Sequence, residues 1–253
     1  ASFNAKPPQI NKRNGTTNML QVRSTRLRSN TTMTTKKMLD GVTVKQILPS
    51  SIMKGSYKKR RVGLLGGSFN PAHTGHRMIT NLALKRLRLN SIWWLVSTQN
   101  PLKSTKGMEP LSKRLSTARL TATHPRVVVK PIEFQLNTRY TADTIALLKK
   151  RYTQTRFVWI MGADNLAQFS EWKDWQRISR MVNIAVFNRP GYSQKALSGK
   201  MARRFANSRI SERKSILLGK LKPPKWVFLH TLLNPISATS IRETKLDNNN
   251  TTQ

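Results

Sequence analysis

From Arg61 onward, short apolar runs alternate with longer amphipathic stretches, and this alternation constrains the fold more than any other feature. The apolar runs are rich in β-branched and aromatic residues and lie at 62–65, 92–96, 127–132, 157–161, 184–187 and 226–229. Several are apolar throughout, as strands covered on both faces should be. Amphipathic stretches at 75–89, 111–121, 141–150 and 193–206 predict helices between them. Repeated strand–helix alternation predicts an α/β fold with a doubly wound parallel sheet.

The charge of the chain is strongly one-sided. Its 253 residues include 46 Lys and Arg but only 10 Asp and Glu, which gives a net charge of +36. A chain this basic repels itself unless anions surround it, so phosphate-rich partners are the first candidates. Because there is no cysteine, a disulfide scaffold, a zinc–thiolate site and a cysteine nucleophile are excluded. No apolar run approaches the ~20 residues that span a bilayer.

The first 60 residues differ in composition from the rest of the chain. They contain 13 Lys and Arg but a single acid, Asp40, and they are rich in Ser, Thr and Asn without a sustained helix or strand period. We therefore expect a basic, mostly irregular extension over 1–60, a folded domain over 61–246 and a polar tail over 247–253. The extension could be a solvated tail, a nucleic-acid-binding arm or an organelle-targeting segment.

The most informative stretch is the glycine-rich turn between the first predicted strand and the first long helix. Two glycines let the backbone approach a phosphate closely, and a helix start adds partial positive charge. His73 and His76 are three residues apart, so both can face one ligand from the start of that helix. A tight turn with merely capping histidines is the plain alternative. The spacing fits neither a Rossmann glycine fingerprint nor a Walker loop, and no third ligand lies nearby in the sequence to make a zinc site.

Four ordered motifs carry a resemblance to a known family. The stretch from Gly66 to His76 resembles the nucleotidyltransferase signature of the bacterial-type nicotinate-nucleotide adenylyltransferases, and 236–242 (ISATSIR) is similar to their C-terminal nucleotide-binding motif. Between these, 139–144 (RYTADT) and 161–165 (MGADN) match the family pattern, with Trp172 downstream, and 100–103 (NPLK) lies where the family has a basic loop. The likeness extends from about Arg61 to Glu243.

The resemblance implies a Rossmann-like nucleotidyltransferase fold and the transfer of the adenylyl group of ATP to nicotinate mononucleotide, which gives deamido-NAD and pyrophosphate. Mg²⁺ would accompany ATP, held mostly by phosphate and water oxygens without a protein metal site. By the same resemblance His73, His76 and Arg242 are the catalytic residues. The expected ATP-binding residues are Gly66, Gly67, Ser68, Phe69, His73, His76, Lys103, Ser240 and Arg242.

The acceptor side of the site, which would bind nicotinate mononucleotide, needs a flat apolar surface for the pyridine ring and polar donors for its carboxylate. The resemblance places Thr141, Asp164, Trp172 and Arg189 there. The Trp172 indole could stack on the pyridine ring, although Trp175 three residues on makes a packed core tryptophan the competing interpretation. Asp164 could hold ribose hydroxyls. The sequence itself discriminates only weakly between nicotinate and nicotinamide, although a strongly positive field favours the acid.

The net charge of +36 exceeds what a small-molecule adenylyltransferase requires. The enzyme could associate with nucleic acid or another polyanion, or the fold could serve as an RNA-associated structural component of a ribonucleoprotein such as an organellar ribosome. The enzyme hypothesis predicts the bacterial cytoplasm and the structural alternative predicts a mitochondrial matrix. The oligomeric state is not encoded in any motif.

Overall fold

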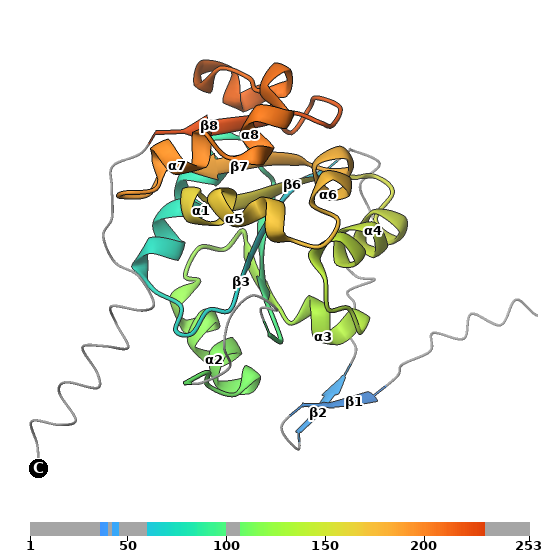
Figure 1. The fold of residues 1–253 in the computed structure, drawn as a ribbon. Coiled ribbons are helices and arrows are strands. Elements are labelled where there is room, and N and C mark those ends of the chain that lie inside the picture. Colours follow the sequence, from blue (N-terminus) through green and yellow to red (C-terminus); the bar gives the residue numbers. More distant parts are fainter. Residues whose placement is uncertain (1–35, 40–41, 46–59, 100–106, 231–253) are drawn as a thin grey trace, which may run out of the picture. The chain divides into compact units, whose positions relative to one another are not determined.

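The computed structural model of the chain describes residues 36–39, 42–45, 60–99 and 107–230. Within them, six strands form one parallel sheet in the order β5-β4-β3-β6-β7-β8 (Figure 1). The strands are β3 (Arg60–Gly67), β4 (Ser91–Val96), β5 (Val127–Lys130), β6 (Thr155–Gly162), β7 (Asn183–Phe187) and β8 (Trp226–Leu229). The chain runs outward from β3 to β5 and then returns to add β6 on the other side of β3. The β3–β6 pair is therefore the topological switch point, where ligands bind in such sheets.

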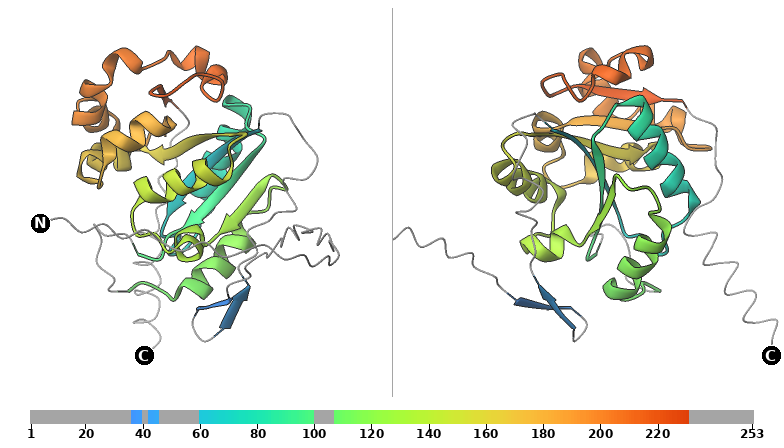
Figure 2. Two further views of the ribbon diagram at one scale, coloured as in Figure 1. Left: turned by 90° about the vertical axis from the view of Figure 1, so that its right-hand side faces the viewer. Right: turned by 180° about the vertical axis from the view of Figure 1, so that it is seen from behind.

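Helices cover both faces of the sheet, as Figure 2 shows from two further directions. Buried residues of α1 (Thr74–Arg86) and α2 (Leu111–Thr121) pack together with one set of strand residues. The opposite core contains buried residues of α3 (Ile132–Leu136), α4 (Thr141–Arg151), α5 (Ala163–Gln168), α6 (Trp175–Met181), α7 (Ser193–Leu197) and α8 (Lys200–Arg204). The described residues also include the short 3₁₀ helices η2 (Phe169–Glu171), η3 (Ala206–Ser208) and η4 (Glu212–Leu217). The predicted doubly wound α/β sheet is confirmed.

The central strands explain why this sequence forms a sheet covered on both sides. All five residues of β7 and all four of β8 are buried, and the interior of β6 is buried from Phe157 to Met161. Alternate side chains of these strands enter opposite cores, so a strand needs apolar residues at every position. The part of the chain that the structure describes contains no helix long and apolar enough to cross a membrane.

Several predicted elements have different bounds in the structure, and two of the differences have a clear cause. The strand predicted over 127–132 ends at Lys130, because Pro131 cannot donate to a ladder and is followed directly by α3. The single helix predicted over 193–206 is two short helices, α7 and α8, separated at Ser198 and Gly199. Glycine is a poor residue for a helix interior, which accounts for the break.

Two of the described strands lie in the segment expected to be irregular. An antiparallel hairpin pairs β1 (Lys36–Leu39) with β2 (Val42–Lys45), with Lys36 opposite Lys45 and Leu39 opposite Val42. The sequence analysis found no strand period here, and four-residue strands are too short to show one. The other residues of the predicted extension, and the predicted tail at 247–253, lie outside the described residues.

Candidate active site

The glycine-rich turn leaves β3 at its carboxyl end and is held tightly against the sheet. A Cβ on Gly66 would lie 2.6 Å from Cη2 of the Trp159 indole, so only glycine fits there. Phe69 adopts a left-handed backbone conformation with φ of 49°. Its buried ring stacks on Trp94 of β4, with 5.1 Å between ring centroids. The turn is therefore anchored from below by two tryptophans, and its backbone passes over the end of the sheet.

His73 and His76 lock each other at the start of α1. His73 is the N-cap residue, and its Nδ1 accepts a hydrogen bond from the backbone N–H of Gly75 at 3.1 Å. The Nδ1 of His76 accepts from the backbone N–H of His73 at 3.2 Å, which completes a capping box. The two rings lie 4.0 Å apart between centroids. Since Nδ1 is an acceptor in both rings, a neutral imidazole carries its proton on Nε2, where it is free for a ligand.

Burial and local charge keep both imidazoles neutral at physiological pH. Burial lowers the pKa of His73 to about 4, and the positive charge of Arg189 acts in the same direction. Burial also lowers the pKa of His76 to about 3, and His73 and Arg189 act in the same direction. A bound polyanion would oppose this shift, because negative charge favours the imidazolium. The pair is suited to binding phosphate oxygens.

Arg189 and Asp164 join the histidines at the same edge of the sheet. Asp164 lies in the first turn of α5, directly after β6, and Arg189 follows β7. Their side chains form an ion pair with 2.5 Å between Nη1 and Oδ2. The other carboxylate oxygen of Asp164 is buried without a hydrogen-bond partner and folds back over Gly162, where a Cβ would collide with it. Three strand ends of the switch point therefore contribute charged or imidazole groups to one site.

Arg114 is a buried residue of the site that the sequence analysis missed. It is 3% exposed, and its guanidinium donates to the carbonyl oxygens of Ser68 and Ser97 at 2.7 Å, of Glu109 at 2.8 Å and of Thr98 at 3.1 Å. It therefore ties the turn after β3 to the end of β4. The sequence did contain a signal for it: Arg114 lies on the same helix face as the buried Leu111, Leu115 and Ala118 of α2. A charged side chain on the apolar face of a helix needs hydrogen-bond partners.

Glu133 is a second missed residue, and it lies beside the guanidinium of Arg114. Burial raises the pKa of Glu133 to about 7, although a hydrogen bond from the Thr98 backbone and the charge of Arg114 oppose the rise. One oxygen of the carboxyl group is buried without a hydrogen-bond partner. No sequence signal distinguished Glu133 from a surface carboxylate, because the short helix α3 that contains it shows no helical period.

Of the four residues expected on the acceptor side, Thr141 and Trp172 lie with the core on the face of the sheet opposite to α1. Trp172 is partly exposed, and its indole meets Phe169 and Trp159 edge to face, with centroid separations of 5.2 and 6.0 Å. It is packed against the core while part of the residue stays exposed, and its stacking on a pyridine ring stays a prediction. Thr141 is the first residue of α4 and is half-buried. The neighbouring Tyr140 ring lies 4.4 Å from Nζ of Lys173, which places the start of α4 beside the Trp172 turn.

The structure brings together only part of the expected site. Gly66 and Gly67 are the last two residues of β3 and pair with β4, so the turn itself begins at Ser68, followed by the buried Phe69. Lys103, Ser240 and Arg242 lie outside the described residues. Within 60–99 and 107–230 no cluster of three or more His, Asp or Glu side chains could hold a metal ion. The carboxylate at the switch point, Asp164, is already paired with Arg189.

Comparisons with known proteins identify the family of the chain. Residues 64–244 match the Cytidylyltransferase-like family. The chain is 43% identical over 185 residues to the "probable nicotinate-nucleotide adenylyltransferase" of Brucella abortus, covering 73% of this chain and 95% of that one. It is 49% identical over 183 residues to the protein of the same name from Gluconobacter oxydans, covering 72% and 94%.

A solved structure supports the fold independently. The nicotinic acid mononucleotide adenylyltransferase of Plasmodium falciparum, solved in complex with NaAD, superposes with a TM-score of 0.55 at 17% identity over 73% of this chain and 83% of that one. At this identity the likeness concerns the fold alone. The bacterial relatives and the family match together show that the chain belongs to the nicotinate-nucleotide adenylyltransferase family of the cytidylyltransferase-like nucleotidyltransferases.

Proposed function

We propose that the chain transfers the adenylyl group of ATP to nicotinate mononucleotide in NAD biosynthesis, with His73 and His76 as the phosphate-binding pair. The observation that carries this assignment is the hydrogen bonding of the two imidazoles: each uses Nδ1 to cap α1 and keeps Nε2–H for a ligand. The bacterial relatives at 43–49% identity support nicotinate mononucleotide as the acceptor. They likewise support the expectation of a cytoplasmic enzyme.

The reaction is an in-line displacement at phosphorus. A 5′-phosphate oxygen of nicotinate mononucleotide forms a bond to the α-phosphorus of ATP, while the bond from that phosphorus to the bridging oxygen of the β-phosphate breaks and pyrophosphate leaves. No covalent intermediate with the protein is needed, so the protein acts by positioning the groups and stabilising the developing charge. Magnesium bound with ATP would supply positive charge to the triphosphate and would be held mostly by phosphate and water oxygens.

We assign the adenylyl side of the site to the turn and α1. The backbone at Gly66, Gly67 and Ser68 approaches the adenosine and the α-phosphate, and Phe69 holds the turn from below. The Nε2–H groups of His73 and His76 donate to phosphate oxygens as charge develops. Lys103, Ser240 and Arg242 are proposed to bind the phosphates from the opposite side on the strength of their motif positions alone.

We assign the acceptor side to Thr141, Asp164, Trp172 and Arg189. The accessible part of the Trp172 indole offers a stacking surface for the pyridine ring, and Thr141 offers a donor to its carboxylate. Arg189 is close enough to lower the pKa of His73 and of His76, so it can contact phosphate where donor and acceptor meet. Its ion pair with Asp164 holds the guanidinium at that edge.

The test is direct. The full chain, incubated with ATP, magnesium and nicotinate mononucleotide, should form deamido-NAD and pyrophosphate in equal amounts, measured by chromatography and a coupled pyrophosphate assay. Nicotinamide mononucleotide serves as the matched acceptor and should react more slowly. A chain that melts cooperatively but forms neither product would contradict the assignment.

We also propose that residues 61–246 are the catalytic domain, with 1–60 as an attached extension. The family match over 64–244 supports these bounds. The alternative of a purely structural, RNA-associated role is not favoured, because close relatives across nearly their whole length are named as adenylyltransferases. The excess positive charge still requires an explanation that is compatible with catalysis.

A further inference from the structure

The positive charge of the described domain is concentrated at one end of the sheet. Residues 175–230, from α6 to the end of β8, contain 13 Lys and Arg and one acid, Glu212. By contrast, residues 107–174 contain 11 Lys and Arg and six acids. Figure 1 shows the segment from α8 to β8 gathered around the β8 edge. Eight basic residues of this segment are exposed: Lys200, Arg203, Arg204, Arg209, Arg213, Lys214, Lys220 and Lys222.

The single acid in this region is already engaged. Glu212 forms ion pairs with Arg86 of α1 and, at 2.9 Å between Oε2 and Nδ1, with His230. Burial raises the pKa of Glu212, but its hydrogen bonds to His230 and the charge of Arg86 outweigh this and leave the pKa below its ordinary value. The carboxylate is therefore ionised, and Arg86 and His230 already occupy its two oxygens. It is not available to neutralise the other arginines and lysines of this region.

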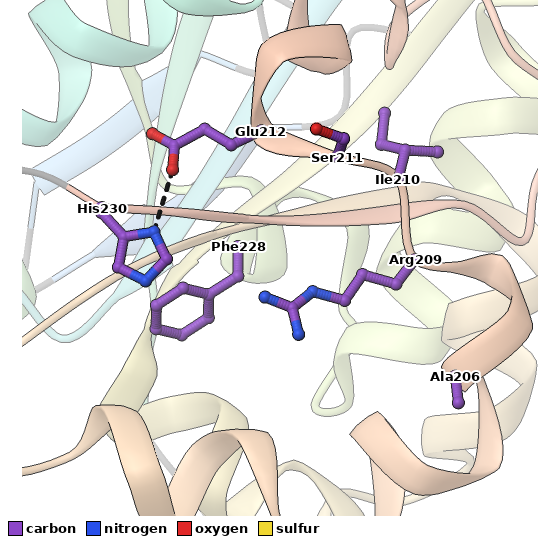
Figure 3. A pocket seen from close by; sticks show the side chains of 7 residues that line it. All are labelled: Ala206, Arg209, Ile210, Ser211, Glu212, Phe228 and His230. Carbon is purple, nitrogen blue, oxygen red and sulfur yellow. Dashed lines mark hydrogen bonds and ion pairs between the residues drawn. The ribbon is translucent and has the colours of Figure 1, made fainter.

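A pocket of about 460 Å³ lies at the β8 edge inside this basic region (Figure 3). Its walls are formed by Ala206, Arg209, Ile210, Ser211, Glu212, Phe228 and His230. None of these is a candidate residue of the adenylyl-transfer site. The backbone N–H of Ile210 donates to the carbonyl of Trp226 at 2.8 Å, so the segment before η4 closes the first half of the strand edge. The pocket lies beyond this hydrogen bond, beside Phe228 and His230.

Arg209 is held in this pocket by aromatic rings. Its guanidinium carbon lies 5.2 Å from the centroid of Trp226 and 6.0 Å from that of Phe228. In Figure 3 the side chain extends along the pocket toward the Phe228 ring, with His230 and Glu212 beyond. Within the described residues no carboxylate forms an ion pair with Arg209. An arginine stacked on rings keeps the donors at the edge of its planar fork available for a second ligand.

We propose that this pocket binds a backbone phosphate of nucleic acid, and that the basic surface from α8 to β8 accommodates the adjoining phosphates. The guanidinium of Arg209 is oriented before binding, and a planar fork matches two phosphate oxygens at once. The surrounding charge of one sign draws in a polyanion and favours repeated phosphates over a single small anion. The role is additional to adenylyl transfer and uses different residues.

Binding is measured with the full chain by fluorescence anisotropy of a labelled single-stranded RNA of about 15 nucleotides and of the DNA of the same sequence. Arg209→Glu should weaken binding of both at least about tenfold and lower the slope of log affinity against log salt by about one. The matched control is Arg119→Glu, an exposed arginine of α2 at the other end of the sheet, which changes the net charge equally and should weaken binding less than about threefold. Equal losses in the two variants, or no binding by the wild type, would overturn the proposal.

Two further measurements separate the proposal from folding defects and from other acidic partners. Arg209→Gln keeps a planar group over Trp226 without the charge, and it should retain the wild-type melting temperature while still losing affinity relative to Arg119→Gln. Adenylyl transfer by both Arg209 variants should equal that of the wild type. Polyglutamate at an equal concentration of charge should compete poorly with RNA, and equal competition would assign the surface to an acidic protein and overturn the nucleic-acid proposal.

Discussion

Arg114 of α2 donates a 2.7 Å hydrogen bond from Nη1 to the carbonyl oxygen of Ser68, in the glycine-rich turn 46 residues before it in the chain. The same nitrogen also donates at 2.7 Å to Ser97, directly after β4. Backbone carbonyls at the ends of parallel strands have no partner in the sheet. A buried guanidinium satisfies several of them together, and it thereby fixes the turn that would bind the adenylyl group.

We predict that Arg114→Leu lowers the free energy of unfolding by about 3 kcal/mol, because it leaves buried carbonyl oxygens without donors. Arg114→Lys should recover only part of this loss, since one ammonium cannot reach four carbonyls arranged for a fork. Urea unfolding of the two variants measures the effect. Arg119→Leu, an exposed change on the same helix, should cost less than about 0.5 kcal/mol; a similar loss there would show that Arg114 acts only through the helix.

The two histidines can be separated into capping and ligand-binding functions. Asparagine places an acceptor oxygen near the position of Nδ1 and is a good N-cap residue, but it has no counterpart of Nε2–H. His73→Asn and His76→Asn should therefore keep the free energy of unfolding within about 1 kcal/mol of the wild type while kcat falls by about 10²–10³. Initial-rate kinetics and urea unfolding on the same samples test this. Variants as active as the wild type would remove the imidazoles from the proposed mechanism.

The sequence predicted the sheet better than it predicted the site. Strands covered on both faces must be apolar at every position, so the runs at 184–187 and 226–229 were recognisable without any tertiary information. The short helices α3, α5 and α6 were missed because five to seven residues show no clear helical period. Arg114 and Glu133 were missed for a different reason: their role depends on carbonyl and amide groups brought together by the ends of separate strands.

The low pKa values of the two histidines predict how stability changes with pH. Both pKa values are below that of an unfolded histidine, so between about pH 4 and 6.5 the unfolded chain binds more protons than the folded chain. The contribution of the pair to stability is therefore present above about pH 6.5 and is lost as the pH falls through that window. His76→Asn should gain stability relative to the wild type as the pH is lowered, measured by urea unfolding in a pH series. A difference that does not vary with pH would contradict the neutral imidazole.

Glu133 should have a pH dependence of the opposite sign. Its pKa of about 7 lies above that of an unfolded glutamate, so the folded chain binds more protons between about pH 4.5 and 7 and stability falls as the pH rises. Glu133→Gln keeps the size of the side chain without the ionised form. We expect this substitution to raise the free energy of unfolding, relative to the wild type, by about 1–2 kcal/mol more at about pH 8 than at about pH 5. This difference is reduced for partial solvent screening of the carboxylate. Equal effects at both pH values would show that the carboxyl group ionises normally.

The ion pair of Arg189 with Asp164 predicts opposite shifts in the titration of His73. Arg189 lowers the pKa of His73, so Arg189→Met should raise it, both by removing a positive charge and by leaving Asp164 unbalanced. Asp164→Asn leaves the guanidinium uncompensated and should lower the same pKa further. Histidine side-chain NMR of the ligand-free chain measures both without relying on activity. Shifts of one sign in the two variants would mean that they act through a rearranged turn, whereas opposite signs would establish that the charges of Arg189 and Asp164 act on His73 in addition to its burial.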